Sequence, residues 1–98
     1  KVYRPEEFAN RAVIVDTNHS NSNKQYKEQI RIAKEVLNNR RHNEELRKLV
    51  KGFMIESYLE EGNQPISEHM TYGKSITDPC LGWDDTRRLI DTIAEMSV

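Results

Sequence analysis

The 98-residue sequence predicts an α/β protein with parallel strands, and three observations support this class. Short continuous apolar runs recur along the chain, as in strands that are buried on both faces. Amphipathic patterns, with charged residues between the apolar positions, follow the first and the last of these runs. The order strand, helix, strand, loop, strand, helix leaves edges and faces unprotected, so we expect part of a barrel rather than a finished sheet.

The first half of the chain predicts a strand and a long helix. Residues 5–10 have the pattern of the last turn of a helix, and the apolar run 12–15 predicts the first strand. A polar loop follows, in which Asn21 or Ser22 is the expected N-cap of a helix that runs to about Arg41. The apolar stripe of this helix recurs at spacings of three and four residues and consists of Tyr26, Ile30, Ala33 and Leu37.

The middle of the chain predicts a second strand and then an irregular connection. Asn43 is the expected N-cap of a short helical turn that ends at Lys48, and 49–55 predicts the second strand. The stretch 60–65 is rich in turn-forming residues. No helical pattern leads to the next strand, so we expect an irregular excursion of the kind that often carries function.

The last part of the chain predicts a third strand at 74–77 and a closing helix. Asp84 or Asp85 is the expected N-cap of that helix, which runs through Met96. Its expected buried face consists of Leu89, Ile90, Ile93 and Ala94.

The composition argues against several classes of partner. Fifteen basic and sixteen acidic side chains, with an isoelectric point near 6.3, give no electrostatic reason to expect nucleic acid or an anionic membrane surface. No apolar stretch approaches the roughly 20 residues of a membrane span. Cys80 is the only cysteine, which excludes an internal disulfide and favours a reducing, cytoplasmic location. Because the chain begins at Lys1, we expect residues 1–98 to form one segment of something longer.

Three polar residues stand at or just past the ends of short apolar runs: His19, Glu56 and Asp78. If the runs are parallel strands, their carboxyl ends lie side by side, and one nitrogen and two carboxylate ligands can converge on a divalent metal ion. Each residue also has a simpler interpretation. A histidine in a polar loop is often a solvated or capping residue, and a single carboxylate after a strand usually caps a helix or faces water.

Three long motifs carry a resemblance to a known family. They are DTNHSNSNK at 16–24, MIESYLEEGNQ at 54–64 and YGKSITDPCLGW at 72–83. Together they resemble the carboxyl-terminal segment of the class I 3-deoxy-7-phosphoheptulonate (DAHP) synthases. The resemblance implies a (βα)8 TIM barrel that condenses phosphoenolpyruvate with erythrose 4-phosphate in the shikimate pathway and releases phosphate. This chain would then supply the carboxyl-terminal part of the barrel, about three parallel strands with flanking helices.

The resemblance also implies a divalent metal, held in that family by a Cys, a His, a Glu and an Asp. The last three match His19, Glu56 and Asp78, whereas the family's Cys lies upstream and is not Cys80. Such mixed ligands accept manganese, iron, cobalt or zinc. His19 is in addition a possible participant in proton transfer, and Asp16 is placed to orient its ring.

The family's phosphate-binding Arg and Lys residues, including a Lys-Pro-Arg-Thr segment, have no match in this chain. We therefore expect a fragment that is inactive alone and belongs to a homo-oligomeric enzyme. The alternative is a stand-alone, non-catalytic remnant that works by self-association or by binding a partner.

Overall fold

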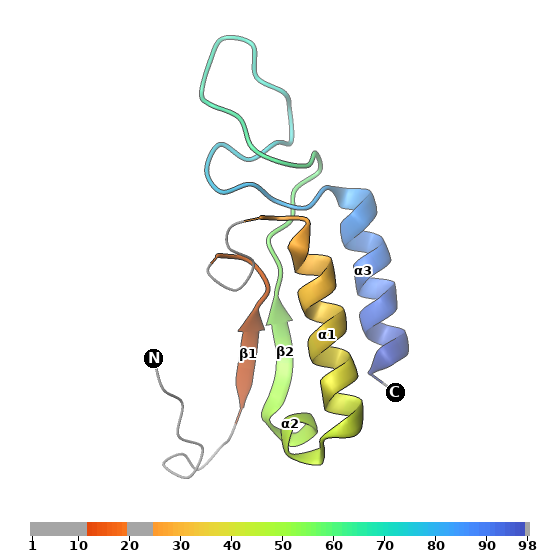
Figure 1. Ribbon diagram of the computed structural model, residues 1–98. Helices are drawn as coiled ribbons and strands as arrows, with labels where there is room; N and C mark the ends of the chain where they lie inside the picture. The colour runs from red at the N-terminus through yellow and green to blue at the C-terminus, as the bar shows by residue number, and fades with distance from the viewer. Residues whose placement is uncertain (1–11, 20–24, 98) are drawn as a thin grey trace.

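The computed structural model describes residues 12–19 and 25–97 (Figure 1). The helical turn predicted at 5–10 and the proposed caps Asn21 and Ser22 lie outside these residues. In chain order the elements are β1 (Val13–Asp16), α1 (Glu28–His42), α2 (Glu44–Leu49), β2 (Val50–Met54) and α3 (Trp83–Met96).

β1 and β2 form a parallel pair, with α1 and α2 in the crossover between them. Val13 pairs with Val50 and Asp16 pairs with Met54, so both strands end at the same edge of the sheet. The predicted α/β class with parallel strands is thereby confirmed. Asn43 caps α2 as predicted, because its side chain accepts a 3.2 Å hydrogen bond from a backbone N–H three residues on.

The third strand predicted at 74–77 was wrong. Within this stretch only Ser75 forms an extended pairing, a single bridge to Asn63. The Ser75 hydroxyl accepts a 3.1 Å hydrogen bond from the backbone N–H of Thr77, and this local bond curls the chain. Serine and threonine hydroxyls compete with a strand ladder in this way, and Pro79 removes a further backbone donor.

The third extended segment lies instead at Leu81, beyond Asp78. Leu81 forms a parallel bridge with Ser57. Its backbone N–H donates to the carbonyl of Glu56 at 3.0 Å, and its carbonyl accepts from Tyr58 at 2.9 Å. Asp78 therefore sits in a bend before this segment, not after a strand as the sequence suggested.

α1 and α3 lie side by side and cover one face of the strand pair (Figure 1). The predicted stripe of α1 holds, because Ala33 and Leu37 are buried and its other members pack against the core. In α3 only Leu89 and Ile93 behave as predicted, whereas Ile90 and Ala94 are exposed. These two positions are each one residue, about 100° of helix, away from the line that faces α1.

The helix starts also differ from the predictions. α1 begins at Glu28, several residues later than expected. α3 begins at Trp83 with Gly82 as its N-cap, so Asp84 and Asp85 lie in its first turn rather than at the cap. In the first turn their negative charges still interact favourably with the positive end of the helix dipole.

The opposite face of the sheet has little cover. On the covered face, Phe53 packs against the core between the helices. On the opposite face, Ile14 is 60% exposed and Met54 is 44% exposed. A parallel sheet normally buries both faces, so this surface is unusually apolar for a finished fold. In the described residues, no helix has the length and apolar character to cross a membrane.

Candidate metal centre

β1 delivers His19 to the edge where both strands end. The ladder continues one residue past β1, because the backbone N–H of Thr17 donates to the carbonyl of Met54 at 3.0 Å. The chain then turns sharply, and His19 adopts a φ of 50°, in the left-handed region that residues with a Cβ seldom adopt. Backbone strain of this kind concentrates at functional sites.

Glu56 follows β2 by two residues and is fixed by a buried glutamine at the start of α1. The backbone N–H of Glu56 donates to the Oε1 of Gln29 at 2.9 Å, and the Nε2 of Gln29 donates to the carbonyl of Glu56 at 3.0 Å. The same Oε1 accepts a 2.9 Å hydrogen bond from the hydroxyl of Thr17. Gln29 therefore joins the ends of both strands to one helix.

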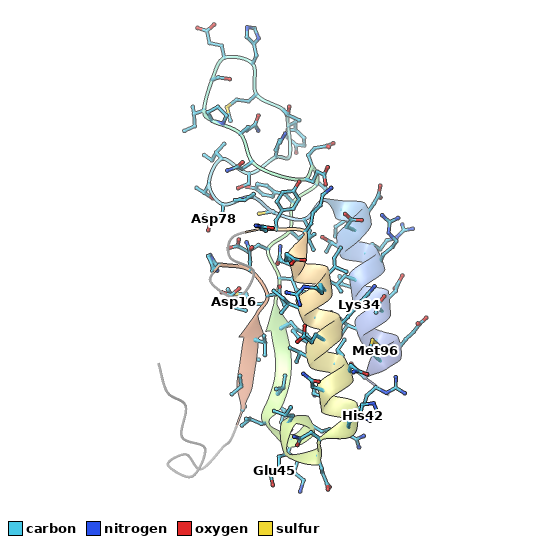
Figure 2. All side chains as sticks on the ribbon, viewed as in Figure 1. Asp16, Lys34, His42, Glu45, Asp78 and Met96 are labelled. Carbon is cyan, nitrogen blue, oxygen red and sulfur yellow. The ribbon has the colours of Figure 1, made fainter. Side chains whose placement is uncertain are left out.

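The three predicted ligands converge. The Nε2 of His19 lies 3.2 Å from the Oε1 of Glu56 and 3.1 Å from the Oδ2 of Asp78. One ligand atom from each residue lies within 4.8 Å of the other two. Atoms bound to one ion at about 2.0–2.2 Å have separations of this order. Figure 2 shows the labelled side chains of Asp16 and Asp78 near the carboxyl end of β1.

The charge of the cluster also favours a cation. The Nδ1 of His19 lies 2.7 Å from the Oδ2 of Asp16, so three carboxylates surround one imidazole. The hydrogen bond to Asp16 raises the pKa of His19 above its ordinary value, and the negative charge of Glu56 raises it further. The side chain of His19 is 38% exposed, which leaves the cluster open to solvent.

Cys80 is not one of the three residues of this cluster. It is buried, and its thiol donates to the carbonyl of Asp78 at 3.3 Å. Burial raises the pKa of the thiol, and the charge of Glu56 acts in the same direction.

Two residues at the site were missed by the sequence analysis, Asn18 and Gln29. Both are almost completely buried. Gln29 had a signal in the sequence, because it lies three residues after Tyr26 and four before Ala33, on the apolar stripe of its helix. A polar side chain on such a stripe needs a buried partner. Asn18 lies in a polar loop and gave no comparable signal.

An α/β fold in which a histidine and a carboxylate just past two parallel strands meet a second carboxylate from a neighbouring bend defines a class of candidate metal-dependent proteins. The sequence model of the DAHP synthetase I family matches residues 1–91 of the chain. The chain therefore belongs to the DAHP synthetase I family.

Relatives of known function point the same way. The chain is 42% identical over 84 residues to the Trp-sensitive phospho-2-dehydro-3-deoxyheptonate aldolase of Escherichia coli K12, and 43% identical over 84 residues to the Phe-sensitive one. It is 41% identical over 85 residues to the corresponding aldolase of Haemophilus influenzae. These alignments cover 84–85% of this chain but only 23% of each relative.

A solved structure gives the same result for the fold. The phospho-2-dehydro-3-deoxyheptonate aldolase of Francisella tularensis SCHU S4 superposes with a TM-score of 0.79 and 32% sequence identity. The match covers 88% of this chain and 24% of that one. The chain thus spans about a quarter of the length of the proteins that it resembles.

Proposed function

We propose that residues 1–98 form one segment, the carboxyl-terminal part of a class I DAHP synthase barrel. The parent enzyme would condense phosphoenolpyruvate with erythrose 4-phosphate and release phosphate. The family membership and the names of the relatives support the activity. The parallel strand pair with one uncovered face supports the barrel, because the remaining strands and helices would protect that face and both edges.

The observation that carries the proposal is the convergence of His19, Glu56 and Asp78 from three separate segments. Their nitrogen and oxygen donors fit a divalent ion such as manganese, iron, cobalt or zinc. When bound, such an ion supplies Lewis acidity that polarises the aldehyde oxygen of the sugar substrate. Asp16 would hold the ring of His19 so that Nε2 faces the ion.

His19 also remains the candidate for proton transfer. Its two ring nitrogens face different partners, Nδ1 toward Asp16 and Nε2 toward the carboxylates of the cluster. A proton held at Nδ1 would therefore be shared with Asp16. We favour the ligand role, because Nε2 is the nitrogen that points at both other ligands.

The 98 residues by themselves would bind metal weakly and would not turn over. The family's Cys ligand and its phosphate-binding side chains have no match here. Three ligands without the fourth leave part of the coordination sphere to water, and substrates without phosphate contacts are not positioned.

Phosphoenolpyruvate consumption in the presence of erythrose 4-phosphate tests this proposal. The assay compares the native polypeptide that carries these residues with the 98-residue chain, each after removal of metal and after its return. We expect metal-dependent turnover by the native polypeptide only. Asp78→Asn should abolish that turnover, whereas Asp91→Asn, at an exposed position of α3, should retain it. Robust turnover by the 98 residues alone would overturn the proposed dependence on upstream residues.

A second candidate function is self-association or partner binding without catalysis. Its support is the exposure of large apolar side chains, among them Ile14 at 60%, Ile66 at 75% and Tyr72 at 89%. A triple variant in which His19, Glu56 and Asp78 are all replaced by Ala separates the two functions. Stabilisation by added metal should disappear if they form a metal site, and a pure interaction module should show no metal-dependent difference.

A further inference from the structure

We propose that Asn18 is the positioning residue that joins the three ligand-bearing segments of the metal centre. This inference rests on the proposed metal site and adds a residue that is not among the three predicted ligands. Asn18 is 2% exposed. Its side chain contacts the ligand Glu56 and the residue after Asp78, and its backbone N–H contacts Asp16, the partner of His19.

The side chain of Asn18 restrains Glu56. Its Nδ2 donates a short hydrogen bond to the Oε2 of Glu56, while the Oε1 of the same carboxylate faces His19 at 3.2 Å. One oxygen is thus held by an amide and the other is presented to the cluster. Glu56 would therefore bind an ion through Oε1 alone, with its rotation fixed before the ion arrives.

The same amide reaches the third ligand segment. The Nδ2 of Asn18 lies 3.4 Å from the carbonyl of Pro79, the residue after Asp78. Asp78 is in a bend rather than on a strand, so no sheet ladder holds its backbone in place. The contact from Asn18 ties this bend to the segment that carries His19.

The backbone of Asn18 acts on the first ligand. Its N–H donates to the Oδ1 of Asp16 at 2.8 Å, and the Oδ2 of Asp16 lies 2.7 Å from the Nδ1 of His19. The two oxygens of Asp16 thus have separate partners, and the ring of His19 is oriented through a carboxylate that Asn18 holds. This contact uses the backbone, so a side-chain substitution leaves it available.

Burial makes the choice of an amide specific. A partly buried carboxylate oxygen that loses its hydrogen-bond donor is destabilised, because little water reaches it to replace the bond. Asn18 satisfies the oxygen of Glu56 that does not face the cluster, without neutralising the charge that the ion needs. Gln29 differs, because its contacts with Glu56 reach only the backbone.

Cobalt titration of the native polypeptide tests the role of Asn18. Affinity is measured by calorimetry and by the visible absorption of bound Co²⁺, and apo stability is measured by thermal melting in a chelator. We expect Asn18→Ala to weaken Co²⁺ binding by about 10- to 100-fold and to change its absorption. The matched control is Asn39→Ala, at an exposed position of α1, which should bind Co²⁺ as the unchanged protein does.

The outcomes are distinguishable. A Co²⁺ affinity of Asn18→Ala within twofold of the control would overturn the positioning role, whether or not apo stability falls. If Asn18→Ala does not fold, Asn18→Ser is measured in its place, and the same loss of affinity is expected because a shorter hydroxyl cannot reach both acceptors. Absence of Co²⁺ binding by the unchanged protein would overturn the metal site itself, and the role of Asn18 with it.

Discussion

His19 combines an unusual backbone conformation with three carboxylate neighbours. Its positive φ turns the ring toward two carboxylates, and a third carboxylate, Asp16, holds the far nitrogen. Proton and metal ion compete for Nε2, because a histidine ligand must be neutral to bind. The raised pKa of His19 means that the proton is held to a higher pH than in an ordinary histidine.

Metal binding should therefore depend on pH, with a direction that follows from this competition. Below the raised pKa of His19 the proton occupies the ring, so Co²⁺ affinity should be weak, and it should rise as pH increases through that pKa. Asp16→Asn removes the largest cause of the raised pKa of His19. The Co²⁺ affinity of this variant should therefore rise at a lower pH than that of the unchanged protein. Titrations across about pH 5.5–8.5 check this. Equal midpoints for the two proteins would contradict the assignment to Asp16.

At the scale of elements, Gln29 determines how α1 meets the strand ends. It is fully buried, and its amide serves Thr17 and both backbone groups of Glu56. These contacts replace a ladder that has already ended on both strands. The side chain of Gln29 thus fixes the positions of Thr17 and Glu56 just past the ends of the two strands.

Replacing this glutamine with an apolar residue should destabilise the fold. Gln29→Leu would remove the acceptor of the Glu56 backbone N–H, at a cost of about 1–3 kcal/mol in the free energy of unfolding, whereas the Thr17 hydroxyl would keep the carbonyl of Met54 and the Glu56 carbonyl would keep the N–H of Leu81. Gln25→Leu, at an exposed position just before α1, is the matched control and should have little effect. Denaturant unfolding of both variants provides the comparison. An unfolding midpoint for Gln29→Leu equal to that of the control would contradict this account.

The excursion between β2 and α3 depends on a glycine at its base, Gly73. Gly73 has a φ of +76°, and a Cβ added there would lie 2.9 Å from the Cβ of Leu59. Its carbonyl also accepts a 2.9 Å hydrogen bond from the backbone N–H of Glu60, which closes the excursion across its base. This position therefore requires glycine both for its conformation and for the close approach of Leu59.

Gly73→Ala should destabilise the protein by about 1–3 kcal/mol, because it combines a strained backbone with a side-chain clash. Gly52→Ala is the matched control, since the nearest atom to its added Cβ is the flexible tip of Ile14 at 3.2 Å. We expect thermal melting to show a larger loss for Gly73→Ala than for Gly52→Ala. The reverse order would contradict the importance of the left-handed turn.

At the scale of the whole molecule, the sheet has one covered and one uncovered face. Ile14 and Met54 lie on the uncovered face, and β1 and β2 pair only with each other in the described part of the chain. Two strands with open edges and an apolar face are marginal in water. The 98-residue chain should therefore self-associate when it is separated from any upstream sequence.

Sedimentation at several concentrations measures this association. Ile14→Glu should weaken it, because the charge would have to be buried against a second copy. Ile90→Glu places the same charge at an exposed position of α3, away from the uncovered face, and should associate like the unchanged chain. A compact monomer that melts cooperatively at every concentration would contradict the expected self-association.

Much of this architecture was predictable because it rests on local patterns. The parallel strands, the stripe of α1 and the cap at Asn43 follow from periodicity and capping chemistry, and they were predicted correctly. The prediction of the third strand failed because a pattern of four residues does not reveal that the Ser75 hydroxyl bonds the local backbone. The convergence of the site residues was expected from their places in the chain, but Asn18 and Gln29 act through contacts between distant segments.

The bend that carries Asp78 also determines when the cluster can assemble. Asp78 meets His19 across 59 positions of sequence, whereas Asp16 meets it across three. Contacts between distant positions form late in folding, because a long loop must close before they provide any gain. The histidine and its orienting carboxylate can therefore come together early, and we expect the last ligand, Asp78, to arrive when Leu81 pairs with Ser57. A bound ion would then act as a latch on the finished chain rather than as a nucleus for its folding.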